Sequence, residues 1–109
     1  MEGFVKVAEI NEFSSRRAKR ILVDSVDVAL FFVDGQLYAV QNDCPHQHFS
    51  MLHEGMLNGC EITCPMHGWT FDLKTGKATI GSGKLKQYAV KVQGNSVWIK
   101  RPVDNVGWG

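Results

Sequence analysis

Two short segments of this 109-residue chain carry side chains suited to binding a metal. Cys44-Pro45-His46 and Cys64-Pro65-Met66-His67 each offer one thiol and one imidazole, and residues 47–63 lie between them. Proline fixes its own φ and disfavours a helical conformation in the residue before it, so each cysteine is expected on a preset turn. Two thiols and two imidazoles in paired segments predict a metal site.

Two kinds of metal centre suit this donor set. Tetrahedral Zn²⁺ accepts thiolates and imidazoles, but structural zinc sites usually pair cysteines with cysteines and histidines with histidines. The single residue between Cys44 and His46 strains two ligands of one ion. It causes no strain if the cysteines bind one iron of a cluster and the histidines bind the other. The spacing therefore favours a [2Fe–2S] cluster, and a zinc-stabilised structural or interaction module is the alternative.

Three further residues compete for a place at this site. His48 lies two positions after His46, but the C-x-H spacing favours His46 as the ligand. We expect His48 and His53 at the surface or just behind the ligands, where they would modulate the cluster. Cys60 makes the number of cysteines odd, which argues against a disulfide framework. We expect it to be a small buried hydrophobe.

Short β-branched and aromatic segments surround the two metal-binding segments. Strands are expected over Phe4–Val7, Arg20–Asp24, Val26–Val33, Leu37–Gln41, Glu61–Thr63, Trp69–Asp72, Tyr88–Gln93 and Ser96–Lys100. Asp34-Gly35 and Gly94-Asn95 predict hairpin turns, the first of type I′. One helical turn is expected within residues 8–13, and loops over 14–19 and 79–84. Sustained helical periodicity is lacking, so the fold class is all-β, an antiparallel sandwich or barrel.

The length predicts a single domain over residues 1–109. Residues 1–41 and 81–101 form its β base, the metal-binding subdomain 42–80 is inserted between them, and 102–109 form a tail. The formal net charge of +1 argues against a nucleic-acid partner. The longest apolar run, Val28 to Val33, is too short to span a bilayer, and residues 1–4 lack signal-peptide character. We expect a cytoplasmic protein that binds no membrane.

The order C-x-H, then C-x-x-H after residues 47–63, resembles the signature of the Rieske [2Fe–2S] family. The strand pattern is similar to a Rieske domain along nearly the whole chain. The resemblance implies one Rieske-type cluster, with Cys44 and Cys64 on the inner iron and His46 and His67 on the outer iron. Because neutral imidazoles replace two thiolates, the reduction potential of such a cluster lies at roughly −150 to +300 mV.

Four positions depart from the Rieske proteins of the cytochrome bc and b6f complexes. Those proteins carry an extra, disulfide-forming cysteine in each ligand loop, where this chain has Phe49 and Met66. They also donate serine and tyrosine hydroxyls to the cluster sulfurs, where this chain has Trp69 and Phe71. Hydrogen bonds to the sulfurs raise the potential, so their loss predicts a low value within the window. In these respects the chain resembles a soluble Rieske-type ferredoxin.

The resemblance implies a one-electron carrier between a reductase and an oxygenase or other redox acceptor. Rieske oxygenases add a large catalytic domain, for which 109 residues leave no room, so we expect an electron-transfer protein rather than an enzyme. The chain also resembles the small Rieske-like subunit of nitrite reductases, which stays open as an alternative. The identity of the donor and the acceptor does not follow from the sequence.

Overall fold

The computed structural model describes residues 3–13, 17–43, 52–65 and 68–101. Within these ranges the regular structure is eleven strands and two 3₁₀ helices. They are β1 (Phe4–Glu9), η1 (Ile10–Phe13), β2 (Ala18–Val23), β3 (Val26–Val33), β4 (Gln36–Gln41), η2 (Leu52–Glu54), β5 (Met56–Asn58), β6 (Glu61–Thr63), β7 (Thr70–Asp72), β8 (Ala78–Ile80), β9 (Gln87–Tyr88), β10 (Val90–Gln93) and β11 (Ser96–Lys100). The predicted all-β fold class is confirmed. Among the described residues, no helix has the length and apolar character needed to cross a membrane.

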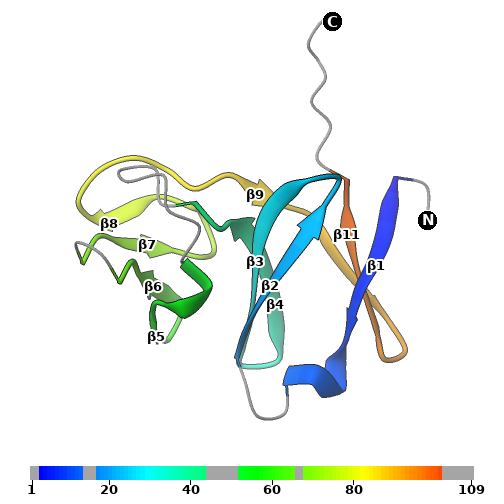
Figure 1. Ribbon diagram of the computed structural model, residues 1–109. Coiled ribbons are helices and arrows are strands. Elements are labelled where there is room, and N and C mark those ends of the chain that lie inside the picture. Colours follow the sequence, from blue (N-terminus) through cyan, green and yellow to red (C-terminus); the bar gives the residue numbers. More distant parts are fainter. Residues whose placement is uncertain (1–2, 14–16, 44–51, 66–67, 102–109) are drawn as a thin grey trace, which may run out of the picture.

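The strands form three antiparallel sheets. Their orders are β1-β11-β10, β2-β3-β4-β9 and β5-β6-β7-β8. Figure 1 shows the first two sheets together on one side of the molecule and the third, which holds Cys64 at the end of β6, on the other. The described chain therefore has a base of two sheets and a separate small sheet beside it.

Both predicted hairpin turns are confirmed. Asp34 and Gly35 connect β3 to β4 with φ values of 49° and 79°, as both central residues of a type I′ turn require. Gly94 has a φ of 60° at the turn between β10 and β11. The turn chemistry alone was sufficient to place these two connections.

Other sequence-based boundaries were wrong or incomplete. Strand β2 begins at Ala18, two residues before the expected start, and the expected helical turn is the 3₁₀ helix η1. The segment 88–93 is not one strand, because the chain changes sheets at Ala89: β9 pairs with β4, whereas β10 pairs with β11. Strands β5 and β8 and helix η2 were missed, and part of the expected loop 79–84 belongs to β8. Each missed element is three residues long, too short to show a periodic pattern.

Strand β3 is buried on both faces. Ala29, Phe31 and Val33 point into one core, and Val28 and Leu30 point into the other. Successive side chains of a strand point to opposite faces, which explains why β3 is an uninterrupted apolar run. The second core, which holds Val28 and Leu30, lies within the base. The first core also takes in residues of the segment between β4 and β9: Leu52, Ile62, Cys64, Phe71, Leu73 and Leu85.

The division into a base and an inserted subdomain remains a prediction, but the shared first core couples the two parts. Phe71 in β7 and Phe31 in β3 are both fully buried in that core. We expect Phe71→Ala to destabilise the whole chain by about 3–5 kcal/mol, because the cavity lies between the two parts. Denaturant titration of the holoprotein, followed by far-UV circular dichroism and by absorbance of the cofactor, should give one coincident transition at lower denaturant. Ile80→Ala, at a 60% exposed position of the same small sheet, is the control and should change stability by less than about 0.5 kcal/mol. Two separate transitions would contradict the coupling.

Candidate metal centre

Cys64 is the one predicted ligand that falls within the described ranges. Cys44, His46 and His67 lie outside them, as do His48, Phe49, Met51 and Met66. Cys64 is a free thiol at the end of β6, and it is only 1% exposed. The structure therefore places a buried free thiol at the start of a short loop, and its role as an inner ligand stays a prediction.

The loop that begins at Cys64, which we call the second ligand loop (residues 64–69), is closed by its own backbone. The Cys64 N–H donates to the Trp69 carbonyl at 2.7 Å, and the Gly68 N–H donates to the Cys64 carbonyl at 3.2 Å. Gly68 has a φ of +74°, a left-handed conformation that side chains with a Cβ disfavour. The loop is therefore a tight extension of the β6–β7 hairpin.

A pair of hydroxyl groups supports the base of this loop. Thr63 and Thr70 face each other across β6 and β7, with 2.9 Å between their Oγ1 atoms. The Thr70 hydroxyl also donates to the Gly68 carbonyl at 3.3 Å, so Thr63 donates its hydrogen to Thr70. The Thr70 hydrogen is thus used within the loop.

The chain that carries Cys44 and His46, the first ligand loop (residues 43–51), joins the described structure at Asn42 and Leu52. The Leu52 N–H donates to the Asn42 carbonyl at 3.1 Å, and the Gly55 N–H donates to the Leu52 carbonyl at 2.9 Å. Helix η2 thus starts directly beside the end of β4. The two ends of the first ligand loop are fixed to each other.

A surface hollow of about 480 Å³ adjoins Cys64. Glu54, Gly55 and Met56 line one side. The other side is lined by Thr63, Cys64, Pro65 and Gly68. A free thiol beside this hollow, together with the further sulfur and nitrogen donors that the sequence supplies, fits a two-iron cluster better than one tetrahedral ion. The residues present therefore suit the predicted cofactor.

Comparison with known proteins agrees with this geometry. The family model for the Rieske [2Fe-2S] domain matches residues 3–97. The chain belongs to the Rieske [2Fe-2S] domain family. Its cofactor is accordingly a Rieske-type [2Fe–2S] cluster, and the zinc alternative loses its support.

Individual relatives of this Rieske domain are ferredoxins. It is 33% identical over 100 residues to the ferredoxin component of a naphthalene 1,2-dioxygenase system from Pseudomonas aeruginosa, a match covering 90% of this chain and 95% of the relative. The solved ferredoxin of carbazole 1,9a-dioxygenase from Nocardioides aromaticivorans IC177 superposes with a TM-score of 0.86 at 26% identity, covering 93% of this chain and all of that one. A structure described as a nitrite reductase small subunit superposes with a TM-score of 0.77 at 26% identity, covering 88% and 96%.

Trp69 lies between the second ligand loop and the segment after β8. It is half-buried and packs on the first core. A Cβ added at Gly81 would stand 2.4 Å from Trp69 Cδ2, so Gly81 lies against the indole ring. Phe71, the other position where the respiratory proteins place a hydroxyl donor, is fully buried in the first core. Neither residue supplies a hydroxyl to this Rieske domain.

Of the additional His and Cys residues, the structure describes His53 and Cys60, whereas His48 lies outside the described ranges. The His53 side chain is 13% exposed and is hydrogen-bonded to Asn42. Its expected role just behind the ligands stays a prediction. Cys60 is half-buried rather than buried, and its thiol donates to the Tyr38 hydroxyl at 3.9 Å. Burial is the largest cause that raises the pKa of the Tyr38 hydroxyl, and the hydrogen bond with Cys60 raises this pKa further. The expectation of a small buried hydrophobe was therefore met only in part, because Cys60 packs against the first core but stays half-buried and makes a polar contact.

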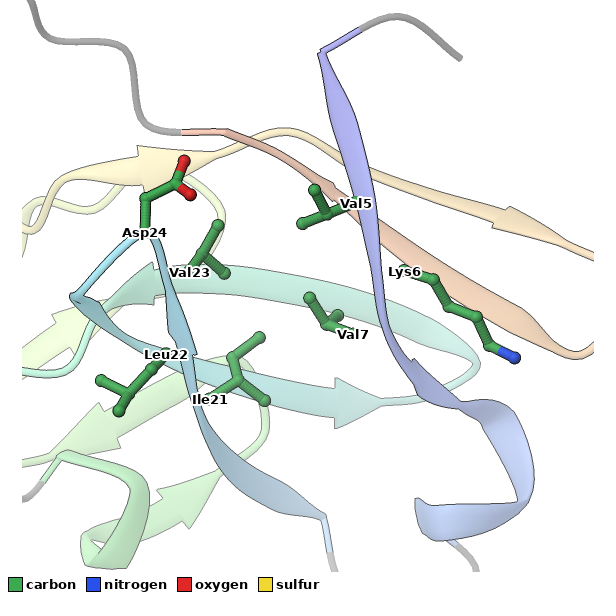
Figure 2. Close-up of a pocket in the computed structure, with 7 residues that line it drawn as sticks. All are labelled: Val5, Lys6, Val7, Ile21, Leu22, Val23 and Asp24. Carbon is green, nitrogen blue, oxygen red and sulfur yellow. The ribbon is translucent and has the colours of Figure 1, made fainter.

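A second hollow, of about 420 Å³, lies in the base away from the cluster loops. Figure 2 shows it between β1 and β2, which pair with β11 and β3 but not with each other. Its lining is Val5, Lys6, Val7, Ile21, Leu22, Val23 and Asp24. These are mainly aliphatic residues without a metal-ligating pair, so this hollow marks the seam between two sheets rather than a cofactor site.

Gly81→Ala is expected to loosen the contact over Trp69. The new methyl group would overlap the indole ring, and the φ of +94° is unfavourable for alanine. We expect a loss of about 1–3 kcal/mol in unfolding free energy from overpacking and faster loss of the visible absorbance under a chelator. Gly94→Ala is the control, because its φ is +60° but no atom lies within 4 Å of the added Cβ. Equal rates of cluster loss in the two variants would show that the Trp69 contact does not protect the site.

Proposed function

We propose that this Rieske domain is a cytoplasmic ferredoxin that carries one electron from a reductase to an oxygenase. The observation that carries the proposal is the match to a naphthalene dioxygenase ferredoxin component over nine-tenths of both chains. When bound, the [2Fe–2S] cluster takes up and releases a single electron. The chain itself binds, orients and shields that cluster, and it performs no bond chemistry of its own.

The proposed ligands are Cys44 and Cys64 for the inner iron and His46 and His67 for the outer iron. Cys64 supports this arrangement, since its 1% exposure leaves it no contact with a partner protein. The family match extends across both ligand segments. Imidazoles on the outer iron would then bring the electron to the surface, where partners dock.

We further propose a potential at the low end of the Rieske window. The side chains at the two positions of the missing donors, Trp69 and Phe71, carry no hydroxyl, and Phe71 faces the first core. The Thr70 hydroxyl is engaged by Thr63 and by the Gly68 carbonyl. With fewer hydrogen bonds to the sulfurs, the reduced and more negative cluster is less stabilised. A low potential suits donation to an oxygenase.

The test of the proposed function is analysis of the anaerobically purified protein. We expect two irons and two acid-labile sulfides per chain, no zinc, and a rhombic EPR signal after reduction with dithionite. Electron flow from a reductase to a dioxygenase component, with each one omitted in turn, tests the carrier role directly. A colourless protein with zinc and no sulfide would contradict the proposal.

His67→Cys and His48→Cys form a matched pair of variants. The His67 change places a thiolate on the outer iron, so the EPR and visible spectra should shift and the potential should fall. The His48 change should leave both unchanged, because His48 is not a ligand in this proposal. A spectral change in the His48 variant, with none in the His67 variant, would reverse the assignment.

The small subunit of a nitrite reductase is the second candidate. The superposition with such a subunit, at a TM-score of 0.77, favours keeping it. Size-exclusion chromatography separates the two functions, because a subunit stays in a stable complex with its reductase and a carrier dissociates. Isolation of the chain in a stoichiometric complex with a large reductase would favour the subunit.

A further inference from the structure

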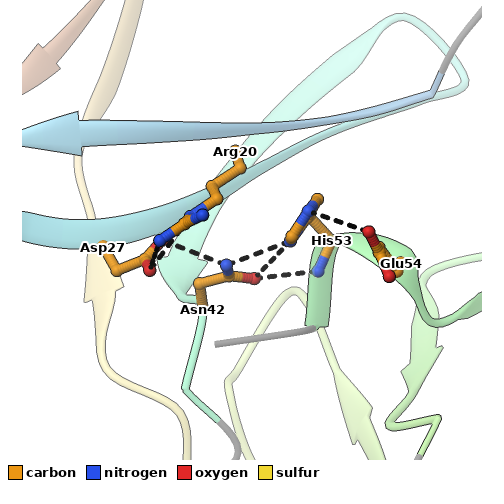
Figure 3. A network of polar contacts seen from close by, with 5 residues as sticks. All are labelled: Arg20, Asp27, Asn42, His53 and Glu54. Carbon is orange, nitrogen blue, oxygen red and sulfur yellow. Dashed lines mark hydrogen bonds and ion pairs between the residues drawn. The ribbon is translucent and has the colours of Figure 1, made fainter. Parts of the chain in front are cut away.

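Asn42 is not among the proposed ligands, yet it directly precedes the first ligand loop and is hydrogen-bonded to the segment that follows the loop. It is fully buried, directly after β4. Its carbonyl accepts the Leu52 N–H at 3.1 Å, and its side-chain Oδ1 accepts the His53 N–H at 2.8 Å. Figure 3 shows Asn42 between Asp27 and His53. Asn42 thus joins the chain before the first ligand loop to the chain after it.

The orientation of the Asn42 amide is fixed by its neighbours. Its Nδ2 lies 3.0 Å from Asp27 Oδ1, and an ionised carboxylate only accepts hydrogen bonds. The same Nδ2 lies 3.0 Å from His53 Nδ1, which leaves Oδ1 for the His53 N–H. Turning the amide over would set two oxygens against each other at Asp27. The side chain therefore has one favourable arrangement.

Asp27 connects this arrangement to the base. Arg20 Nε lies 3.0 Å from Asp27 Oδ1, and Arg20 Nη2 lies 2.8 Å from Oδ2, so the guanidinium binds the carboxylate through two nitrogens. Hydrogen bonding to Asp27 raises the pKa of Arg20. The Asp27 carbonyl also accepts the Asn42 N–H at 3.1 Å. The side chain of Asp27, in β3, is only 14% exposed, and its ion pair with Arg20 ties β3 to β2.

We propose that Asn42 is a positioning residue for the cluster. Its hydrogen bonds with Asp27, Leu52 and His53 hold the two chain segments that flank Cys44 and His46, and in this proposal they limit where those two ligands can stand. This inference rests on the proposed function, because it takes Cys44 and His46 as ligands. Groups that orient metal ligands typically change affinity by about 10–100-fold when they are replaced.

Asn42→Asp tests the proposal in the holoprotein. It places a carboxylate oxygen where Nδ2 now lies, 3.0 Å from Asp27 Oδ1. We expect cluster release into a chelator to accelerate by about 10–100-fold and the g-values of the reduced cluster to shift. Adding Asp27→Asn restores one amide facing one carboxylate and the original net charge. This double variant should return the release rate to within about threefold of the unaltered protein.

Gln87→Glu is the matched control. Gln87 Nε2 donates to the Leu73 carbonyl at 3.1 Å and to the Lys74 carbonyl at 3.0 Å, in the turn after β7. The change again sets a carboxylate against oxygens, but those of Leu73 and Lys74 rather than any group that Asn42 contacts. We expect a loss of stability with unchanged g-values and a release rate within about threefold of the unaltered protein.

Three results bear on the outcome. Equal release rates and g-values in Asn42→Asp and Gln87→Glu would overturn the positioning role, as would a double variant no better than Asn42→Asp. If Asn42→Asp does not fold, Asn42→Ser, which is neutral and too short to reach Asp27, is compared with Gln87→Glu by the same measurements. An unaltered protein without iron and sulfide would instead contradict the proposed function, before any variant is examined.

Discussion

Burial of β3 on both faces is the constraint on which the rest of this structure depends. Its alternating side chains belong to two cores, one within the base and one shared with the small sheet that carries Cys64. A strand in this position cannot slip by one residue, because a slip would exchange the side chains of the two cores. The register of the β3–β4 hairpin is thereby fixed, and with it the point where the first ligand loop begins.

The same register explains the polar contacts behind that loop. Val28 pairs with Gln41, which places Asp27 and Asn42 side by side at the end of the hairpin. Their buried polar groups are costly unless they are hydrogen-bonded, and here the carboxylate, the amide and the backbone groups satisfy one another. Apolar packing would hold these segments together without fixing a direction. Hydrogen bonds determine both the distance and the orientation of the loop ends.

The parts of the fold that the sequence predicts are those with a local cause. The type I′ turn at Asp34-Gly35 follows from two residues that tolerate positive φ, and β3 follows from its apolar run. The contact between Asp27 and Asn42 joins residues far apart in the chain, and a single asparagine before a ligand segment gives no signal of its role. Strands β5 and β8 were missed because their three residues are held by pairing rather than by propensity. The four predicted ligands follow from residue type and spacing, whereas their surroundings depend on tertiary structure.

The two ligand loops differ in how the chain segments on either side of them are held together. The second loop, residues 64–69, continues a hairpin, and its ends are joined by the 2.7 Å bond between Cys64 and Trp69. The first loop, residues 43–51, is longer and lies between β4 of the base and helix η2. A longer loop has more conformational entropy to lose, although the cost grows only slowly with length. The hydrogen bonds from Leu52 and His53 to Asn42 join the two chain segments that flank this loop. With the cluster held by both loops, as proposed, its position depends on a hairpin on one side and on the buried Asn42 amide on the other.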